Sequence, residues 1–228
     1  MKKIIPAAFS LLISTTLISQ NNTMTYEQKI SYLIGYDIGR NLSQQPFAFD
    51  ADAMLKGVRL AFEKQSLEFS EQEMQTTLQE WSRQMQQEMQ NRANAELNTN
   101  KAEGRAFLEQ NKQDKDVKVT VSGLQYKVVT MGTGAKPTSP EDRVTVHYEG
   151  RLLDGTLFDS SYDRGETISF GLNLVIPGWT EGVQLMPIGS KFIFYIPSDL
   201  AYGDRGSHPA IPGGATLIFT VELFGINE

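Results

Sequence analysis

No proline or glycine interrupts the sequence from Ser70 until Gly104, and this feature limits the folds available to the chain. Ser70 followed by Glu73 forms a capping-box pattern, which is typical of a helix N-terminus. We therefore expect one helix from Ser70 to about Asn111, and about 40 residues rising roughly 1.5 Å each make an arm on the order of 60 Å long. A helix of this length rarely serves a compact monomer, so we expect it to connect two separate domains.

Two shorter helices are expected upstream of this arm. Thr25 and Gln28 form another capping box, followed by apolar residues at helical spacing that predict a helix over about 26–44. Asp50 is suited to cap the next helix, an amphipathic segment whose apolar residues run from Met54 to Phe62. Two such short helices bury little apolar surface and make a poor core by themselves.

The first half of the long helix carries an apolar stripe, whereas the segment from Gln90 to Lys101 is almost wholly polar. We expect the first half to be packed and the second half to be solvated. The two short helices supply too little apolar surface to cover the stripe, so we predict a homodimer through residues 25–90. The stripe consists of Met74, Leu78, Trp81, Met85 and Met89.

Charge and composition exclude several classes of function. The formal net charge is −6 and no cluster of Lys and Arg offsets it, which argues against nucleic acid as a partner. The chain has no cysteine, so disulfides, thiolate metal sites and cysteine nucleophiles are excluded. Its two histidines do not have the pattern of metal ligands, and we expect neither a metal nor a cofactor.

The N-terminus has the pattern of a secretory signal peptide. Two lysines precede an apolar run from Ile4 to Ile18 that is too short and too polar for a spanning helix, which needs about 20 mainly apolar residues. Cleavage after Ser19 fits best, so we expect a signal peptide over residues 1–19. The protein would then be exported to the periplasm or to the bacterial cell surface, associated with the outer membrane. An uncleaved N-terminal anchor or a disordered leader is the alternative.

After Asn111 the sequence changes to alternating Val, Thr, Tyr and Phe with frequent glycine turns, so this half is mostly strand. Val146 and Tyr148 are expected to face one side of a strand and His147 the other. The only helix expected here is short, over Thr180–Leu185. The predicted fold class is therefore α+β: an N-terminal all-α dimerisation domain and a long linker helix, then an antiparallel β-sheet wrapped around a short helix.

Five sequence blocks follow one another through the C-terminal half: Val146–Gly150, Asp154–Ser161, Val175–Trp179, Ala201–Gly203 and Ala215–Leu223. In order and spacing they resemble the FKBP-type peptidyl-prolyl isomerases. With the helical arm upstream, the whole chain is most similar to the dimeric Mip-like (macrophage infectivity potentiator) branch of that family. The resemblance implies an FKBP-like fold, with a signal peptide over 1–19, a helical dimerisation domain over 20–69, a connecting helix over 70–111 and an isomerase domain over 112–228.

The resemblance also implies the residues of the site. Asp159 would place a carboxylate near the substrate carbonyl and bond Tyr148, and the hydroxyl of Tyr202 would donate to a substrate carbonyl. The implied catalytic residues are Asp159, Tyr202, Phe158 and Tyr148. The implied substrate-binding residues are Trp179 as the floor of a proline pocket, with Phe170, Val175, Ile176, Ile211, Phe219 and Ile168 around it.

Each of these residues has a simpler interpretation. Trp179, Phe170 and Phe219 are also ordinary core residues of a small β domain. A carboxylate at Asp159 beside Phe158 costs free energy unless it is paired, which favours a site over a core. Ile168 stands where single-domain relatives often have an aromatic residue, and this difference bears on substrate preference.

The chain lacks the Walker loop, the His-Glu-x-x-His helix and the Gly-x-Ser-x-Gly elbow, so conventional hydrolysis is not expected. His147 is expected to be structural, and His208 to lie near the pocket. An apolar pocket suits rotation about an X-Pro bond, in which no covalent bond is broken.

We therefore expect an isomerase that assists folding of exported or envelope proteins, with proline-containing unfolded or extracellular proteins and macrolide immunophilin ligands as partners. The alternatives are a dimeric holdase chaperone and a surface adhesin or virulence module that uses the pocket only for binding.

Overall fold

A computed structural model describes residues 24–45 and 47–227. The chain divides into two compact units, and the boundary between them in the sequence lies between Met74 and Gln75. The signal peptide expected over residues 1–19, with its cleavage after Ser19, lies outside the described residues. Within the part of the chain that is described, no helix has both the length and the apolar character required to cross a membrane.

The first unit contains two helices, α1 (Tyr26–Ser43) and α2 (Ala51–Phe62). The capping box expected at the start of α1 is present, because the Thr25 side chain accepts from the backbone N–H of Gln28 while the Gln28 side chain accepts from the Thr25 N–H. The Asp50 carboxylate caps α2 by accepting from the N–H of Ala53 at 2.8 Å. Neither helix buries a residue within the chain.

The long helix is α3 (Glu71–Asn111), 41 residues without a break. Its N-terminus carries the expected capping box: the Ser70 hydroxyl accepts from the Glu73 N–H at 3.2 Å, and the Glu73 carboxylate accepts from the Ser70 N–H at 2.9 Å. The sequence prediction of this helix is confirmed in both its start and its end.

The polar segment of α3 is exposed as expected at residues 90–96, 98 and 99, and the prediction is wrong only towards the end of that segment. Asn100 and Lys101 are half-buried and Gly104 is fully buried, because this part of the helix packs against the β domain. In the first half, Leu78 and Met89 are 55% and 62% exposed within the single chain. A polar helix segment can thus be a contact surface when its amide and ammonium groups find partners on the neighbouring domain.

The β domain is one antiparallel sheet of seven strands, in the order β1-β2-β6-β7-β3-β4, with β5 also paired to β3. This arrangement confirms the antiparallel sheet expected from the sequence. The strands are β1 (Val117–Val119), β2 (Gln125–Thr130), β3 (Arg143–Arg151), β4 (Leu157–Ser160), β5 (Ile168–Gly171), β6 (Lys191–Ile196) and β7 (Leu217–Ile226).

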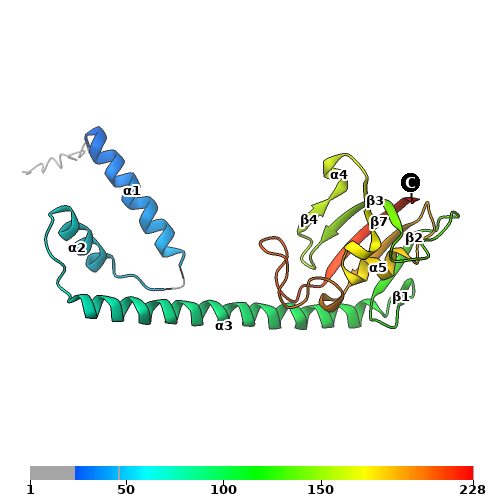
Figure 1. Ribbon diagram of the computed structural model, residues 1–228, viewed down its shortest axis with the longest axis horizontal. Helices are drawn as coiled ribbons and strands as arrows, with labels where there is room; N and C mark the ends of the chain where they lie inside the picture. Colours follow the sequence, from blue (N-terminus) through cyan, green and yellow to red (C-terminus); the bar gives the residue numbers. More distant parts are fainter. Residues whose placement is uncertain (1–23, 46, 228) are drawn as a thin grey trace, which may run out of the picture. The chain divides into compact units, whose positions relative to one another are not determined.

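The main helix of this domain, α5 (Pro177–Val183), lies against one face of the sheet (Figure 1). It begins three residues before the expected Thr180, because Pro177 occupies the first helical position, where its fixed φ and missing N–H are tolerated. A one-turn helix, α4 (Ser161–Arg164), was not expected from the sequence. Single 3-10 turns occupy Leu172–Leu174 and Ser198–Leu200.

The core lies between α5 and the sheet. Along β3, Val146 and Tyr148 are buried with the other inward positions, as the alternation predicted. Trp179 and Val183 of α5 belong to the same apolar cluster. The helix approaches the sheet closely at Gly182, because a Cβ at this position would stand 2.7 Å from the Phe194 ring.

Replacing Gly182 by alanine should therefore lower the free energy of unfolding by roughly 1–3 kcal/mol, because the added methyl group overpacks the contact between α5 and the Phe194 ring. Thermal or denaturant unfolding of the purified variant measures this. Lys136→Ala, at an exposed loop position, should stay within about 0.5 kcal/mol of the parent protein. An unchanged midpoint for Gly182→Ala would show that the helix can move away from the sheet at no cost.

Candidate functional site

A cavity of about 600 Å³ opens between α5, the sheet and the loop that joins β6 to β7. All the catalytic and substrate-binding residues expected from the sequence line it, so the structure brings the whole set together. Its lining consists of Tyr148, Phe158, Asp159, Ile168, Phe170, Leu174, Val175, Ile176, Trp179, Tyr202, Ser207, Ala210, Ile211 and Phe219.

Trp179 lines this cavity, and three aromatic rings contact its indole. It meets the rings of Tyr148 and Phe219 edge to face, with centroid distances of 5.2 and 5.1 Å, and the tilted ring of Phe170 at 5.4 Å. Such arrangements are the favoured ones for aromatic pairs. Only 4% of Trp179 is exposed, yet it still lines a hollow, so it serves the core and the site together.

The walls described here come from five separate segments. Phe170 and Ile168 belong to β5, Val175 and Ile176 precede α5, and Phe219 belongs to β7. Phe158, in β4, packs edge to face on Phe219 at 5.5 Å. Tyr202 and Ile211 come from the loop between β6 and β7. Ile168 lines the cavity and is 38% exposed.

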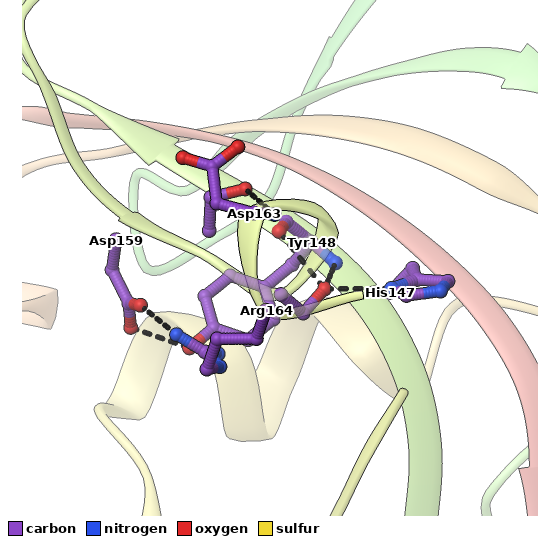
Figure 2. A network of polar contacts seen from close by, with 7 residues as sticks. His147, Tyr148, Asp159, Asp163 and Arg164 are labelled. Atoms are coloured by element: carbon purple, nitrogen blue, oxygen red, sulfur yellow. Dashed lines mark hydrogen bonds and ion pairs between the residues drawn. The ribbon is translucent and has the colours of Figure 1, made fainter. Parts of the chain in front are cut away.

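The one carboxylate on the cavity wall is tied by two partners (Figure 2). The Tyr148 hydroxyl donates a short hydrogen bond to Asp159, which confirms the contact expected from the sequence. Arg164 donates from Nη1 to the carboxylate at 2.6 Å and from Nη2 to the Tyr148 hydroxyl oxygen at 3.0 Å. These three side chains form a closed triangle of polar contacts at the edge of an apolar cavity.

Arg164 reaches this triangle because α4 is anchored to β3. The buried hydroxyl of Ser161 accepts from the Tyr148 N–H at 2.7 Å and donates to the Tyr148 carbonyl at 3.1 Å. It also lies 2.8 Å from Nδ1 of His147, whose ring stacks on Tyr162 at 4.6 Å. His147 therefore has structural partners outside the cavity lining, as expected.

Burial of Asp159 favours the neutral acid and would by itself raise its pKa. The hydrogen bonds from Tyr148 and Arg164, together with the charge of Arg164, outweigh this effect and hold the pKa below its ordinary value. Burial, reinforced by the nearby carboxylate, raises the pKa of the Tyr148 and Tyr202 hydroxyls. At neutral pH the cavity thus presents one anionic carboxylate and neutral phenols that can donate hydrogen bonds.

The sequence reasoning missed four residues of the site: Arg164, Leu174, Ser207 and Ala210. Arg164 had a usable signal, because a cation five residues after a carboxylate inside an aromatic motif is a candidate counter-ion. Leu174, 80% exposed at the rim, had none. In the Ser-His-Pro segment the lining residue is Ser207, whereas His208 does not line the cavity.

Among the described residues, no group of three or more His, Cys, Asp or Glu side chains is arranged to hold a metal ion. The lining of the cavity offers aromatic walls, one carboxylate and phenol hydroxyls.

Two family models match the chain. Residues 134–224 match the model described as FKBP-type peptidyl-prolyl cis-trans isomerase, and residues 27–128 match the model of the domain amino terminal to it. Together these matches include α1, α2, α3 and nearly all of the sheet.

Several known proteins are similar over most of their length. The chain is 44% identical to the FKBP-type peptidyl-prolyl cis-trans isomerase FkpA of Aeromonas hydrophila, covering 90% of this chain and 78% of that protein. It is 38% identical to the outer membrane protein MIP of Legionella longbeachae, covering 100% and 98%. The crystal structure of FkpA from Escherichia coli has a TM-score of 0.76 at 38% identity, covering 89% of this chain and 97% of that chain.

Replacing Arg164 by methionine should raise the pKa of Asp159, because the substitution removes a hydrogen bond and a positive charge while burial persists. An NMR titration of the Asp159 carboxyl measures the shift. Arg151→Met is the matched control, since Arg151 pairs with Glu149 and makes no contact with Asp159, and it should leave the pKa unchanged.

The same pair predicts a pH dependence of stability. The folded pKa of Asp159 lies below the unfolded value of about 3.9, so its contribution is present above that pH and is lost as the pH falls through the folded pKa. The difference in melting temperature between the parent protein and Arg164→Met should shrink on acidification. A constant difference down to the acid limit would contradict an ion pair at this site.

Proposed function

Because this chain belongs to the FKBP-type peptidyl-prolyl cis-trans isomerases, we propose that its activity resides in the cavity above Trp179 and assists the folding of exported or envelope proteins. The observation that carries the proposal is the hollow itself: aromatic and aliphatic side chains enclose a space of about 600 Å³ above the indole, with one paired carboxylate at its edge. That volume lies within the range of small-ligand sites, about 300–1,000 Å³.

The barrier to rotation about an X-Pro bond is about 18–20 kcal/mol, because the twisted amide loses its conjugation. Water stabilises the planar, charge-separated resonance form by hydrogen bonds to the carbonyl oxygen. Moving the bond into an apolar cavity removes that stabilisation and lowers the cost of twisting. The proline ring would lie over Trp179 between Phe170 and Phe219, so that only the carbonyl side turns.

The polar groups at the edge of the cavity act on the carbonyls. The neutral hydroxyl of Tyr202, 40% exposed, is free to donate to a substrate carbonyl, and the backbone N–H of Ile176 is a second candidate donor. Asp159 would place its negative charge beside the carbonyl carbon of the twisting bond, which becomes more electrophilic as conjugation is lost. Arg164 and Tyr148 keep this carboxylate ionised and oriented.

A homodimer through residues 25–90 is proposed from the exposed apolar side chains of each helix. Leu33 and Ile34 of α1, Leu55 of α2, and Leu78 and Met89 of α3 all have more than half of their surface exposed within the single chain. Exposed apolar side chains gathered on a helix face are typical of a surface that binds a partner. A second copy of the chain presents the same faces and suits them.

The name of the Legionella longbeachae relative places that protein in the outer membrane. Together with the export signal expected over residues 1–19, this supports periplasmic or surface localisation. Proline-containing unfolded or extracellular proteins are then the natural substrates, and macrolide immunophilin ligands would compete for the cavity.

A chaperone activity is a second candidate, because the same apolar helix faces suit the binding of unfolded segments. The full-length protein with its isomerase site disabled should then still suppress aggregation of an unfolded client.

Asp159→Leu should lower kcat/KM on an X-Pro peptide by roughly tenfold or more, and Tyr202→Phe by several-fold, because each removes a polar contact to a substrate carbonyl. A protease-coupled isomerisation assay measures both, and a macrolide immunophilin ligand should abolish the activity of the parent protein. Asp163→Leu, an exposed carboxylate that does not line the cavity, is the matched control.

The melting temperature of Tyr202→Phe should stay close to that of the parent protein, and that of Asp159→Leu should fall no further than that of Arg164→Met, because both of these changes remove the same ion pair. Loss of activity that merely follows loss of stability would assign these residues a structural role. A folded parent protein without isomerase activity would defeat the proposed location of catalysis.

Introducing glutamates at Leu78 and Met89 together should convert a dimer into a monomer at micromolar concentration, because two charges would have to be buried in the interface. Sedimentation equilibrium measures the mass. Gln87→Glu, on the opposite face of α3, should remain dimeric, and the monomeric double variant should retain activity on short peptides. A parent protein that sediments as a monomer would contradict the proposed dimer.

A further inference from the structure

The second half of α3 contacts the loop that forms one wall of the cavity. This loop, called here the covering loop, joins β6 to β7 over residues 197–216 and contributes Tyr202, Ser207, Ala210 and Ile211 to the lining. Figure 1 shows the loop descending to α3, and both belong to the same compact unit.

Three contacts fasten the covering loop to the helix. The side-chain amide of Asn100 donates to the carbonyl oxygen of Gly213 at 2.9 Å in a partly buried setting. The ammonium of Lys101 pairs with the carboxylate of Asp204. Gly104 faces Thr216 so closely that a Cβ on the glycine would stand 2.2 Å from the threonine hydroxyl oxygen.

Two glycines, Gly213 and Gly214, allow the covering loop to approach α3 closely. A Cβ at Gly214, whose φ is +75°, would stand 2.8 Å from a methyl carbon of Leu97 and 3.0 Å from Cγ of Lys101. The absence of side chains therefore lets the loop backbone lie directly on α3.

Hydrogen bonds within the covering loop connect these contacts to the cavity. The Gly214 N–H donates to the Gly203 carbonyl at 2.9 Å, next to Tyr202. Ser207 and Ile211 exchange two backbone hydrogen bonds, at 2.8 and 2.9 Å. Ile211 is therefore held in place only two residues before Gly213, whose carbonyl accepts the hydrogen bond from Asn100. A displacement at Gly213 or Gly214 thus reaches the residues proposed to bind and polarise the substrate.

The end of α3 has its own attachment to the sheet. Asn111 donates to the side-chain oxygen of Gln125 at 2.9 Å, and Gln125 in turn donates to the carbonyl of Leu108 at 2.9 Å. The Phe107 ring lies 5.8 Å from that of Tyr195. Changes at residues 100 and 101 can therefore release the covering loop while the helix stays attached to the sheet.

We propose that Asn100 and Lys101 of α3 are positioning residues for proline isomerisation, because they hold the covering loop in the conformation that completes the cavity wall. Helix α3 then connects the two parts of the chain and also holds the covering loop of the cavity in place. This inference rests on the proposed location of activity in the cavity, and every comparison below is made against an active parent protein.

Asn100→Asp is the decisive variant. It has the same shape, but a carboxylate cannot donate to the Gly213 carbonyl and repels it. We expect kcat/KM on an X-Pro peptide to fall about threefold to tenfold, the size expected from one lost hydrogen bond. Hydrogen exchange of the Gly214 amide should become faster, which reports loosening of the loop directly. Asn98→Asp, exposed on the same helix, should change neither quantity.

The Lys101–Asp204 ion pair provides a second, independent test, which still decides the question if Asn100→Asp fails to fold. Lys101→Glu and Asp204→Lys should each lower kcat/KM, and the double variant with the charges exchanged should recover it. Recovery is not expected if the single changes act only by general destabilisation.

Wild-type kcat/KM and unchanged Gly214 exchange in Asn100→Asp would overturn the proposal, as would single charge variants that the exchanged pair does not rescue. An inactive parent protein would instead contradict the proposed location of catalysis.

Discussion

The structure depends on a cluster of aromatic rings that pack edge to face on Trp179, a residue that also lines the cavity. Protein interiors normally fill such space, because an empty cavity forfeits dispersion contacts. Here Tyr148, Phe170 and Phe219 each come from a different strand of the sheet and pack on the indole, and all four side chains still line a cavity of about 600 Å³. The same side chains therefore belong both to the packed interior and to the cavity wall, so the fold of the sheet positions the cavity.

Much of this arrangement was predictable from the sequence. The capping residues Thr25, Asp50 and Ser70 marked the helix starts, since each places an acceptor where the first backbone N–H groups need one. The resemblance of five short blocks to one family identified the full set of expected lining residues. Spacing alone would not have done so, because Trp179 and Phe219 are also typical of an ordinary core.

What could not be predicted depends on contacts between distant segments. The charge of Arg164 marked it as a candidate counter-ion, but the one-turn helix α4 that presents it, anchored through Ser161, leaves no periodic pattern in the sequence. The polar second half of α3 was expected to be solvated, yet Asn100 finds a carbonyl more than a hundred residues away. Local hydropathy reports how apolar a segment is and carries no information about the polar partners that folding brings to it.

The two attachments of α3 also determine where the β domain can be separated from the rest of the chain. A fragment that starts at residue 112 keeps every strand but loses the donor to the Gly213 carbonyl and the cation beside Asp204. Water can form hydrogen bonds in place of those partners. It cannot replace helix α3, which sets the distance between the covering-loop contacts and the contact of Asn111 with Gln125. A truncation or fusion that preserves these contacts with the covering loop must therefore include α3 from Asn100 onward.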